Sequence, residues 1–312
     1  VAYLLMAISS DLSAQQNPIH YASETHLSNV KQLTFGGENA EAYWSFNDSM
    51  LTYQYTNKKQ GIMCDQIWTI NPADTTRKRI SSRNGRTTCS YFLPGDSQIL
   101  YASTHTGGDS CPGEPVHVHG KYLWPVYPDY EIYISDLKGN LVKQLTNNHY
   151  YDAEAVVSPK GDKILFTSDR SGDLELYTMN LDGSNVTQIT NQLGYDGGAN
   201  FSPDGQNVVW RASHFEADSE RTEYRNNLKE HLVSPMKMEL FTARVDGSNR
   251  QQLTHLGCAN WAPNFDPTGK KIIFSSNHQT HYITINLFMI DTDGTNLEQI
   301  TYDKVFDAFA MF

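Results

Sequence analysis

Basic residues are scarce in this chain of 312 residues, which has 24 Lys and Arg against 35 Asp and Glu and a net charge of −11. That charge repels phosphate backbones and anionic lipids, so nucleic acid is excluded as a partner. Long apolar runs are also missing, because no stretch approaches the ~18 residues that span a bilayer. Aromatic residues make up 12% of the chain, too many for disorder. The composition therefore predicts a folded chain that does not span a membrane.

Catalytic signatures are missing as well. The sequence has no G-x-S-x-G, no H-E-x-x-H and no G-x-x-x-x-G-K-[ST]. Residues 291–302 begin like a calcium-binding loop, but Tyr302 stands where a bidentate Glu is required. The sequence thus favours a protein that is not an enzyme and has no resident cofactor, apart from a candidate divalent cation discussed below.

Residues 1–26 differ in character from the rest of the chain. Residues 1–10 are mostly apolar, and small residues follow before Gln15. This pattern is typical of the end of a signal peptide and its leader, and it predicts a periplasmic or secreted protein. An amphipathic N-terminal helix or a stray strand is the alternative interpretation. Export would place the four cysteines where disulfides can form.

A repeated motif is the strongest feature of the sequence. Residues 158–170 (SPKGDKILFTSDR) recur with changes at 202–214, 266–278 and 93–105, and a weaker copy starts at Ser45. A short strand with an aromatic residue follows each copy, at 66–70, 131–135, 175–179, 239–243 and 286–290. Asp-Gly turns and a closing Gln-Leu-Thr or Gln-Ile-Thr complete the unit. Because Asp-Gly between alternating runs indicates a hairpin, each unit predicts four antiparallel strands, which is one propeller blade.

The number of repeats predicts the ring. Five complete blades have first strands near residues 41, 89, 153, 197 and 260, and 307–312 matches the first strand of a sixth. Residues 27–34 match a fourth strand, and we expect them to close the sixth blade, because the last edge of a propeller needs cover. The predicted fold is an all-β, six-bladed β-propeller of four-stranded blades, with the sixth blade incomplete. It forms one domain over residues 27–312, and we expect a monomer when the ring is complete.

The repeat S-P-D-G-x-x-I-x-F-x-S-x-R, followed by an (I/L)-Y-x-M strand, D-G-x-N and Q-L-T, resembles the propeller repeats of TolB-like proteins. The resemblance implies a six-bladed ring in an exported protein that binds a protein partner. Similar repeats also occur as accessory propellers beside secreted peptidase domains and in some polysaccharide lyases. The resemblance therefore says more about the fold than about the activity.

Two insertions of about 20 residues, 106–128 and 215–236, lie between the second and third strands of their blades. The strand order places both on the face opposite the short turns, so we expect this face to bind the partner. We expect acidic residues at the starts of the first strands to ring the channel mouth there: Glu41, Asp152, Glu154, Asp196 and Asp307. Such a ring could hold a divalent cation or a basic partner segment.

A structural role for these acids is the alternative. Four basic or potentially basic residues close the second strands at one equivalent position: His105, Arg170, His214 and His278. A repeated basic residue beside a repeated acid favours pairing within each blade. A polysaccharide lyase or metal-dependent carbohydrate enzyme would instead use His105, His214 and His278 around the channel mouth.

The first insertion carries further candidate residues. His117 and His119 form a His-x-His pair that suits a transition metal if the segment is extended, although a solvated loop is the competing interpretation. Cys89 and Cys111 are the expected disulfide, which closes the shorter loop. Cys64 is the rival partner, and free thiols are the remaining possibility.

Three functions follow from these observations. The first is an exported, non-enzymatic propeller that binds a protein or peptide through the face of the two insertions. The second is an accessory propeller of a larger secreted peptidase or other hydrolase. The third is the metal-dependent polysaccharide lyase.

Overall fold

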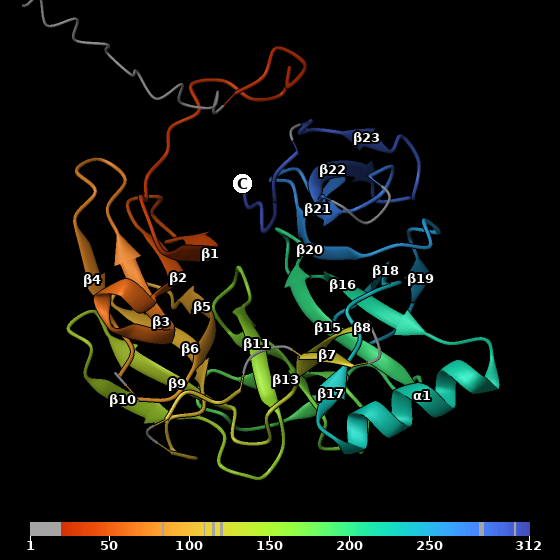
Figure 1. Cartoon of the computed structure of the whole chain (residues 1–312), viewed down its shortest axis with the longest axis horizontal. Coiled ribbons are helices and arrows are strands. Elements are labelled where there is room, and N and C mark those ends of the chain that lie inside the picture. Colours follow the sequence, from red (N-terminus) through yellow and green to blue (C-terminus); the bar gives the residue numbers. More distant parts are fainter. Residues whose placement is uncertain are drawn as a thin grey trace, which may run out of the picture.

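The computed structural model describes residues 20–82, 84–108, 110–113, 116–118, 121–280, 284–302 and 304–312. Five four-stranded antiparallel sheets follow one another along the chain and surround a central channel (Figure 1). The predicted all-β propeller of four-stranded blades is confirmed, but the described residues form five blades, so the predicted count of six is not confirmed.

The strands of each blade run in sequence order from the channel outward, and the first is called the inner strand below. Blade 1 has β1 (Glu38–Trp44), β2 (Leu51–Asn57), β3 (Ile62–Ile70) and β4 (Arg77–Arg79), with the 3-10 helix η1 (Lys58–Gln60). Blade 2 has β5 (Thr87–Phe92), β6 (Gln98–Ser103), β9 (Glu131–Asp136) and β10 (Leu141–Gln144). Blade 3 has β11 (Asp152–Val157), β12 (Lys163–Ser168), β13 (Glu175–Asn180) and β14 (Thr187–Gln188). Blade 4 has β15 (Gly194–Phe201), β16 (Asn207–His214), β18 (Glu239–Arg244) and β19 (Gln251–Gln252). Blade 5 has β20 (Asn260–Phe265), β21 (Lys271–Ser276), β22 (Asn286–Asp291) and β23 (Glu298–Gln299).

The recurring motifs correspond to recurring hydrogen bonds. In the Ser-Pro turns, the Ser158 hydroxyl accepts the backbone N–H of Lys163 at 3.1 Å, and Ser202 accepts that of Asn207 at 2.9 Å. The threonine of each Gln-Leu-Thr or Gln-Ile-Thr accepts the N–H of a third-strand residue at 2.8 to 2.9 Å, in the pairs Thr146–Ile132, Thr190–Leu176, Thr254–Leu240 and Thr301–Leu287. These buried hydroxyls tie the third strand to the end of the fourth, which explains why the motif recurs.

Apolar side chains between neighbouring blades form the core. Four buried clusters join blades 1 and 2, 2 and 3, 3 and 4, and 4 and 5. Another cluster, around Leu51, Tyr53, Tyr55 and Ile70, draws its buried members from blade 1 alone, with Leu33 of the N-terminal segment packed against it. The ring is therefore open between blade 1 and blade 5.

Residues 304–312 lie in this opening, and the chain ends there (Figure 1). Their contacts reach both sides, because the Phe309 N–H donates to Ser275 Oγ at 3.0 Å and the Trp44 N–H lies 3.4 Å from Met311 Sδ. A single isolated parallel bridge joins Phe306 to Ile285, the residue before β22. A cavity of about 290 Å³, called the gap cavity below, remains between this segment and blade 1.

Residues 27–34 form no strand, which departs from the expected closing role. The third strand of a sixth blade, with which they would pair, is not among the described elements. The local turn of the motif is nevertheless present, since Gln32 Nε2 donates to the Thr34 carbonyl at 2.8 Å, as Gln188 does to Thr190 and Gln252 to Thr254. Just before this segment, His26 lies 2.7 Å from Glu298 of blade 5, so the N-terminal segment spans the opening.

The two insertions meet on one face, as predicted, and pair into a three-stranded sheet. It consists of β7 (Val116–Val118) and β8 (Lys121–Pro125) from blade 2 and β17 (Leu232–Val233) from blade 4. The face that carries this sheet is called the insertion face below. Helix α1 (Asp218–Lys229) precedes β17 and was not predicted from the sequence. It packs through Tyr224, whose hydroxyl donates to Asp173 and to the Gly194 carbonyl at 2.6 and 2.8 Å.

Helix α1 has 12 residues, of which only Tyr224 is buried. In the described part of the chain, no helix has the length and apolar character that crossing a membrane requires.

Candidate functional site

A bulge interrupts every inner strand at the same place. The pairing register shifts after Ala40, Thr88, Ala153, Gly197 and Trp261. The residue that follows, called the bulge position below, has a left-handed φ between 47° and 57° in each blade: Glu41, Cys89, Glu154, Gly198 and Ala262. Phe309, with φ 61°, occupies the matching position in residues 307–312. Four of these five blade residues carry a side chain in a conformation that favours glycine, so the repeated bulge is a constrained feature of the ring.

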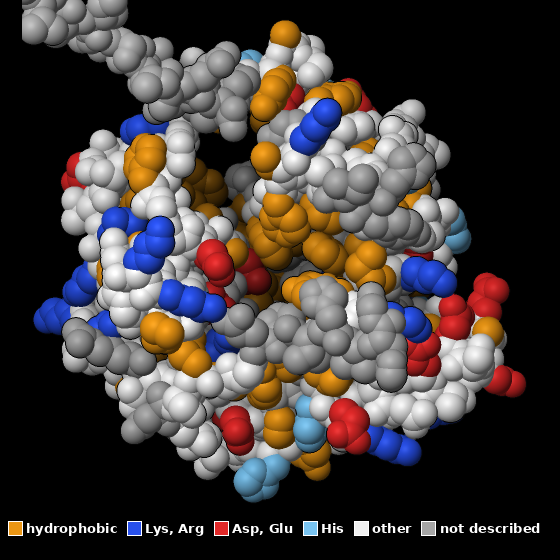
Figure 2. Space-filling model, in the orientation of Figure 1, with side chains coloured by type: hydrophobic (Ala, Val, Ile, Leu, Met, Phe, Trp, Pro, Cys, Tyr) orange, Lys and Arg blue, Asp and Glu red, His pale blue; other side chains and the backbone are white. Residues whose placement is uncertain are grey.

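All six bulge positions line one cavity of about 240 Å³ at the centre of the ring, called the central cavity. Aromatic side chains supply much of its wall: Tyr43, Trp124, Tyr127, Tyr130, Tyr151, Tyr195, Trp261 and Phe309. Trp124 comes from the insertion sheet and packs against Trp261 in a tilted arrangement, with ring centroids 5.4 Å apart. On the insertion face, Figure 2 shows a central hollow with hydrophobic side chains along much of its rim and acidic side chains at one side.

Glu154 and Arg211 form a buried ion pair in the wall of the central cavity. Glu154 also accepts hydrogen bonds from the hydroxyls of Thr167 and Tyr195, at 2.7 and 2.8 Å, and from the Gly198 N–H at 2.8 Å. Burial opposes ionisation, but the Arg211 guanidinium and these donors outweigh it and hold the pKa of Glu154 below its usual value. Glu154 is therefore ionised and fully engaged inside the protein.

Glu41 occupies the same position in blade 1, but among the described residues it forms no ion pair. Its Oε2 is buried without a hydrogen-bond partner. Burial raises the pKa of Glu41 to about 7, against the opposing effect of the Cys89 thiol and with a further increase from the negative charge of Glu154. Cys89, next around the ring, has a thiol pKa well above its usual value, chiefly through burial and then through Glu41 and Glu154. Glu41 is thus a carboxyl group that changes charge near neutral pH.

The expected acidic ring contains two of its five predicted members, because only Glu41 and Glu154 line the central cavity. Asp152 and Asp196 are fully buried on their inner strands, two residues before the bulge position, and they do not line the cavity. Asp152 pairs with Arg170 at 2.8 Å and Asp196 with His214 at 3.0 Å. The alternative of pairing within a blade therefore holds for these two acids.

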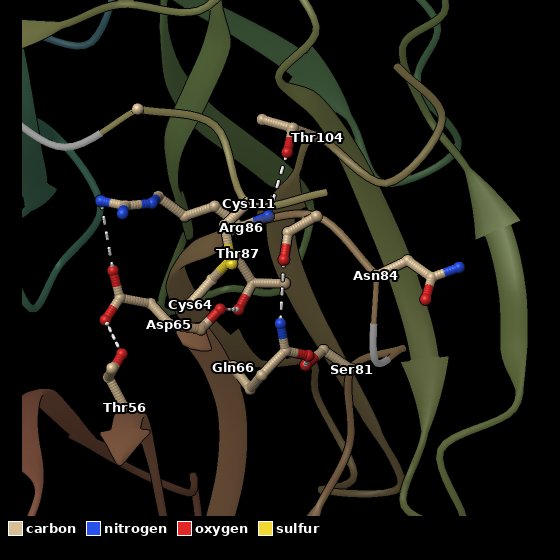
Figure 3. Close-up of a disulfide and its surroundings, with 12 residues drawn as sticks. Thr56, Cys64, Asp65, Gln66, Ser81, Asn84, Arg86, Thr87, Thr104 and Cys111 are labelled. Atoms are coloured by element: carbon tan, nitrogen blue, oxygen red, sulfur yellow. Dashed lines mark hydrogen bonds and ion pairs between the residues drawn. A yellow bond between two sulfur atoms is a disulfide. The ribbon is translucent and has the colours of Figure 1, made fainter. Parts of the chain in front are cut away.

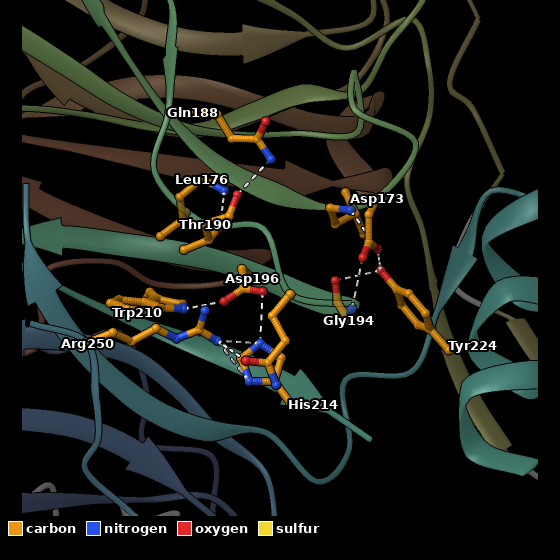
Figure 4. A network of polar contacts seen from close by, with 12 residues as sticks. Asp173, Leu176, Gln188, Thr190, Gly194, Asp196, Trp210, His214, Tyr224 and Arg250 are labelled. Atoms are coloured by element: carbon orange, nitrogen blue, oxygen red, sulfur yellow. Dashed lines mark hydrogen bonds and ion pairs between the residues drawn. The ribbon is translucent and has the colours of Figure 1, made fainter. Parts of the chain in front are cut away.

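The pair in blade 4 belongs to a larger polar network (Figure 4). Asp196 also accepts a hydrogen bond from Trp210 Nε1 at 2.6 Å, and Arg250 Nη2 lies 3.1 Å from His214 Nε2. The Arg250 guanidinium also lies 5.4 Å from the centre of the Phe241 ring. These contacts join the first, second and third strands of the blade to the residue that precedes the fourth, so the network has a structural role.

The remaining predicted site residues lie apart. His105 Nδ1 shares a hydrogen bond of 2.8 Å with Ser103 Oγ, its ring packs tilted against Tyr133, and burial lowers its pKa. His278 packs edge-on against Phe288. Asp307 lies in the C-terminal segment, where its N–H donates to the Ile285 carbonyl at 2.9 Å. His105, His214 and His278 each contact residues of their own blade.

The disulfide joins Cys64 and Cys111, with Cα atoms 5.7 Å apart (Figure 3). The expected Cys89–Cys111 pair is therefore wrong and the rival pairing is correct, because Cys89 lies at a bulge position in the cavity wall. Cys89 and Cys258 are free thiols. The disulfide ties the first insertion to β3 next to Asp65, which accepts from Thr56 and lies 3.6 Å from Arg86. The insertion is thus fixed to blade 1 at the rim of the cavity.

The His-x-His pair cannot be placed as a site. His119 lies outside the described residues, and of His117 only the backbone, in β7, is described. Elsewhere in the described ranges, no group of three or more His, Cys, Asp or Glu side chains is arranged to hold a metal ion. The metal hypothesis for this pair stays a prediction.

Sequence reasoning missed several residues of the central cavity, above all Arg211, Trp124 and Trp261. Arg211 had a detectable signal, because it is a charged residue within the otherwise mostly apolar run of β16. Trp124 and Trp261 had none, since their meeting depends on how the insertion folds over the ring.

The fold and the site define a class, a β-propeller whose channel is covered on one face by a sheet built from two blade insertions. Residues 127–232 match the protein-family model described as the TolB beta propeller domain. The matched residues make up about a third of the chain, and the match agrees with the resemblance to TolB-like propeller repeats drawn from the sequence. A search of curated protein sequences found no match.

Solved structures with the same fold have diverse functions. A candidate TolB from Agrobacterium tumefaciens is 18% identical, with a TM-score of 0.60, and the match covers 85% of this chain and 81% of that one. A puromycin-hydrolyzing peptidase from Mycobacterium tuberculosis is 10% identical, with a TM-score of 0.55 and coverage of 86% and 39%. An oligogalacturonate lyase in complex with manganese is 13% identical, with a TM-score of 0.54 and coverage of 86% and 66%. At these identities the likeness establishes the fold alone.

Proposed function

We propose that this chain is an exported, non-enzymatic β-propeller that binds a protein or peptide on its insertion face, with the central cavity receiving part of the partner. The observation that carries the proposal is the convergence of both insertions over a cavity with an aromatic wall. Aromatic residues dominate protein interfaces, and long loops on a rigid scaffold usually carry binding. The Cys64–Cys111 disulfide supports export, since disulfides persist in oxidising compartments.

A selection from a random peptide library tests this proposal. The purified protein is immobilised through Lys160, an exposed residue in a short turn on the opposite face, and the affinity of each selected peptide is measured by calorimetry. Thr88 lines the central cavity, so Thr88→Trp should fill it and weaken peptide binding at least tenfold. The matched control is Thr187→Trp, at an exposed position on the outer strand β14, which should leave the affinity unchanged. Failure to select any binder, or equal binding to both variants, would refute the proposal.

An accessory propeller of a larger secreted hydrolase is the second candidate. The match to the peptidase favours it, because this chain spans only 39% of that protein. The sequence of the complete gene distinguishes the two, since this candidate requires a hydrolase domain in the same chain.

A further inference from the structure

The charges that line the central cavity do not balance. They belong to Glu41, Asp65, Glu154, Arg86 and Arg211. Arg211 pairs with Glu154, and Arg86 lies 3.6 Å from Asp65. Glu41 remains without a cationic partner among the described residues of the cavity wall. A buried carboxylate without a partner is costly, so the cavity favours a ligand that brings a positive charge.

The size and the walls of the cavity narrow the choice of ligand. At about 240 Å³ it is smaller than the pockets of drug-sized ligands but has room for one long side chain. Arg211 already uses two of the aromatic rings, with its guanidinium carbon 5.6 Å from the centre of Trp124 and 5.2 Å from that of Tyr195. The other aromatic residues of the wall are Tyr43, Tyr127, Tyr130, Tyr151, Trp261 and Phe309. Aromatic faces attract ammonium and guanidinium groups.

We propose that the central cavity takes a basic side chain of the bound partner, a lysine or an arginine, with its charged group against Glu41. The inference rests on the proposed function, because the side chain belongs to the protein or peptide bound on the insertion face. The proposal specifies the charge of the partner's side chain, because a neutral side chain of the same length would leave Glu41 without a counter-ion.

The charge state of Glu41 should control this binding. The titratable and charged groups that share the cavity wall with it are Tyr43 on its own strand, Asp65 on β3, Arg86 before β5, Cys89 on β5, Glu154 on β11, Tyr195 on β15, Arg211 on β16, Tyr127 and Tyr130 before β9, and Tyr151 before β11. With a pKa of about 7, Glu41 is mostly protonated at pH 5.5 and ionised at pH 8. A cation should therefore bind more tightly at pH 8 than at pH 5.5. Below pH 7, its affinity should fall by up to tenfold for each pH unit.

Small probes test the cavity without a known partner. Butylammonium and butylguanidinium reproduce the ends of lysine and arginine, and butanol and butyrate are the neutral and anionic controls of similar length. NMR titrations at pH 8 should show at least one cation binding tenfold more tightly than butanol. Glu41→Gln should reduce that preference to within twofold. The control Glu38→Gln, at an exposed position on the same strand, should preserve it.

The inference is overturned if neither cation binds, if butanol binds as tightly, or if the preference survives in Glu41→Gln. The selected peptides separate this failure from failure of the proposed function. If peptides bind in the cavity but replacing their lysines and arginines with glutamine changes their affinity less than twofold, the basic side chain is wrong and the binding function stands. If the cations bind through Glu41 but no peptide is selected, the cavity chemistry stands and the partner proposal fails.

Discussion

Glu41 and Glu154 occupy equivalent bulge positions, yet the pKa values of their carboxyl groups shift in opposite directions. The difference comes chiefly from Arg211, which forms an ion pair with Glu154 but lowers the pKa of Glu41 only weakly. The position of Arg211 on β16 thus gives the two equivalent acids different roles. Glu154 is a structural residue, and Glu41 is a candidate binding residue.

The pH dependence of stability follows from the raised pKa of Glu41. The unfolded chain releases this proton near pH 4.5 and the folded protein near pH 7, so the folded state holds more protons between these values. Stability from this group is therefore present below pH 4.5 and falls as the pH rises through 7. Glu175, with a pKa raised to about 8 by burial and then by Asp196, acts in the same direction.

We expect Glu41→Gln to remove the part of this loss that Glu41 causes, while the part caused by Glu175 remains. Urea unfolding at pH 5 and pH 8 should show the wild type losing free energy of unfolding with rising pH, and the variant losing up to about 3 kcal/mol less. Glu38→Gln should behave like the wild type. A variant with the same pH dependence as the wild type would show that Glu41 is ionised normally in the folded protein.

Gly198 allows the Glu154–Arg211 pair to form. Its φ is +57°, and a Cβ at this position would overlap Arg211 Nη1. We expect Gly198→Ala to displace Arg211 and to destabilise the fold by about 3 to 5 kcal/mol, the usual effect of breaking a buried ion pair. Gly205→Ala is the matched control, since Gly205 has φ +66° but no neighbour within 3.6 Å of an added Cβ. Similar losses in the two variants, measured by urea unfolding, would mean that backbone strain alone is responsible.

At the scale of elements, the insertion sheet covers the channel because it is anchored at three places. Its strands come from blades 2 and 4, and the disulfide holds it to blade 1. The Trp261 indole adds a further contact by donating to the Pro235 carbonyl at 2.9 Å.

Loss of the disulfide should loosen this cover. The Cys64–Cys111 bond closes a loop with a sequence separation of 47 residues, for which chain entropy gives about 4 kcal/mol of stabilisation. We expect the double variant Cys64→Ala, Cys111→Ala to melt at a lower temperature and its β8 amides to exchange hydrogen faster. The amides of β13, the third strand of blade 3, serve as the internal reference. Unchanged protection of β8 would show that packing alone holds the sheet in place.

The blades themselves could be predicted because each repeat contains the residues that form its own turns and strand pairs. The Ser-Pro turns, the Asp-Gly hairpins and the closing threonines act within about 20 residues, and the inner strands lie where the repeats indicated. The central cavity could not be predicted in the same way. The left-handed bulge places Glu154 in the cavity wall and leaves Asp152 outside it. In a regular strand the two residues, two positions apart, would lie on the same face. Arg211, Trp124 and the Cys64–Cys111 pair depend on contacts between blades.

At the scale of the whole molecule, the opening between blades 1 and 5 leaves apolar groups exposed. Phe35 and Phe306 are 70% and 58% exposed, and the gap cavity lies beside Phe306. Such exposed apolar surface promotes association.

We expect the chain to self-associate through this opening as its concentration rises. Sedimentation velocity should show larger species for the wild type and fewer for Phe35→Ser combined with Phe306→Ser. The control Val186→Ser removes an exposed apolar residue at a turn of blade 3 and should leave the association unchanged. A monomeric wild type across the concentration range would contradict this expectation.

The central claim is that the cavity at the middle of the ring receives a basic side chain of a partner bound on the insertion face. A crystal structure of the protein with a selected peptide, grown at pH 8, tests it most directly. We predict a lysine or arginine side chain inside the cavity, with a nitrogen within hydrogen-bond distance of a Glu41 oxygen. A peptide bound on the opposite face, or one whose side chains stay outside the cavity, would contradict the claim.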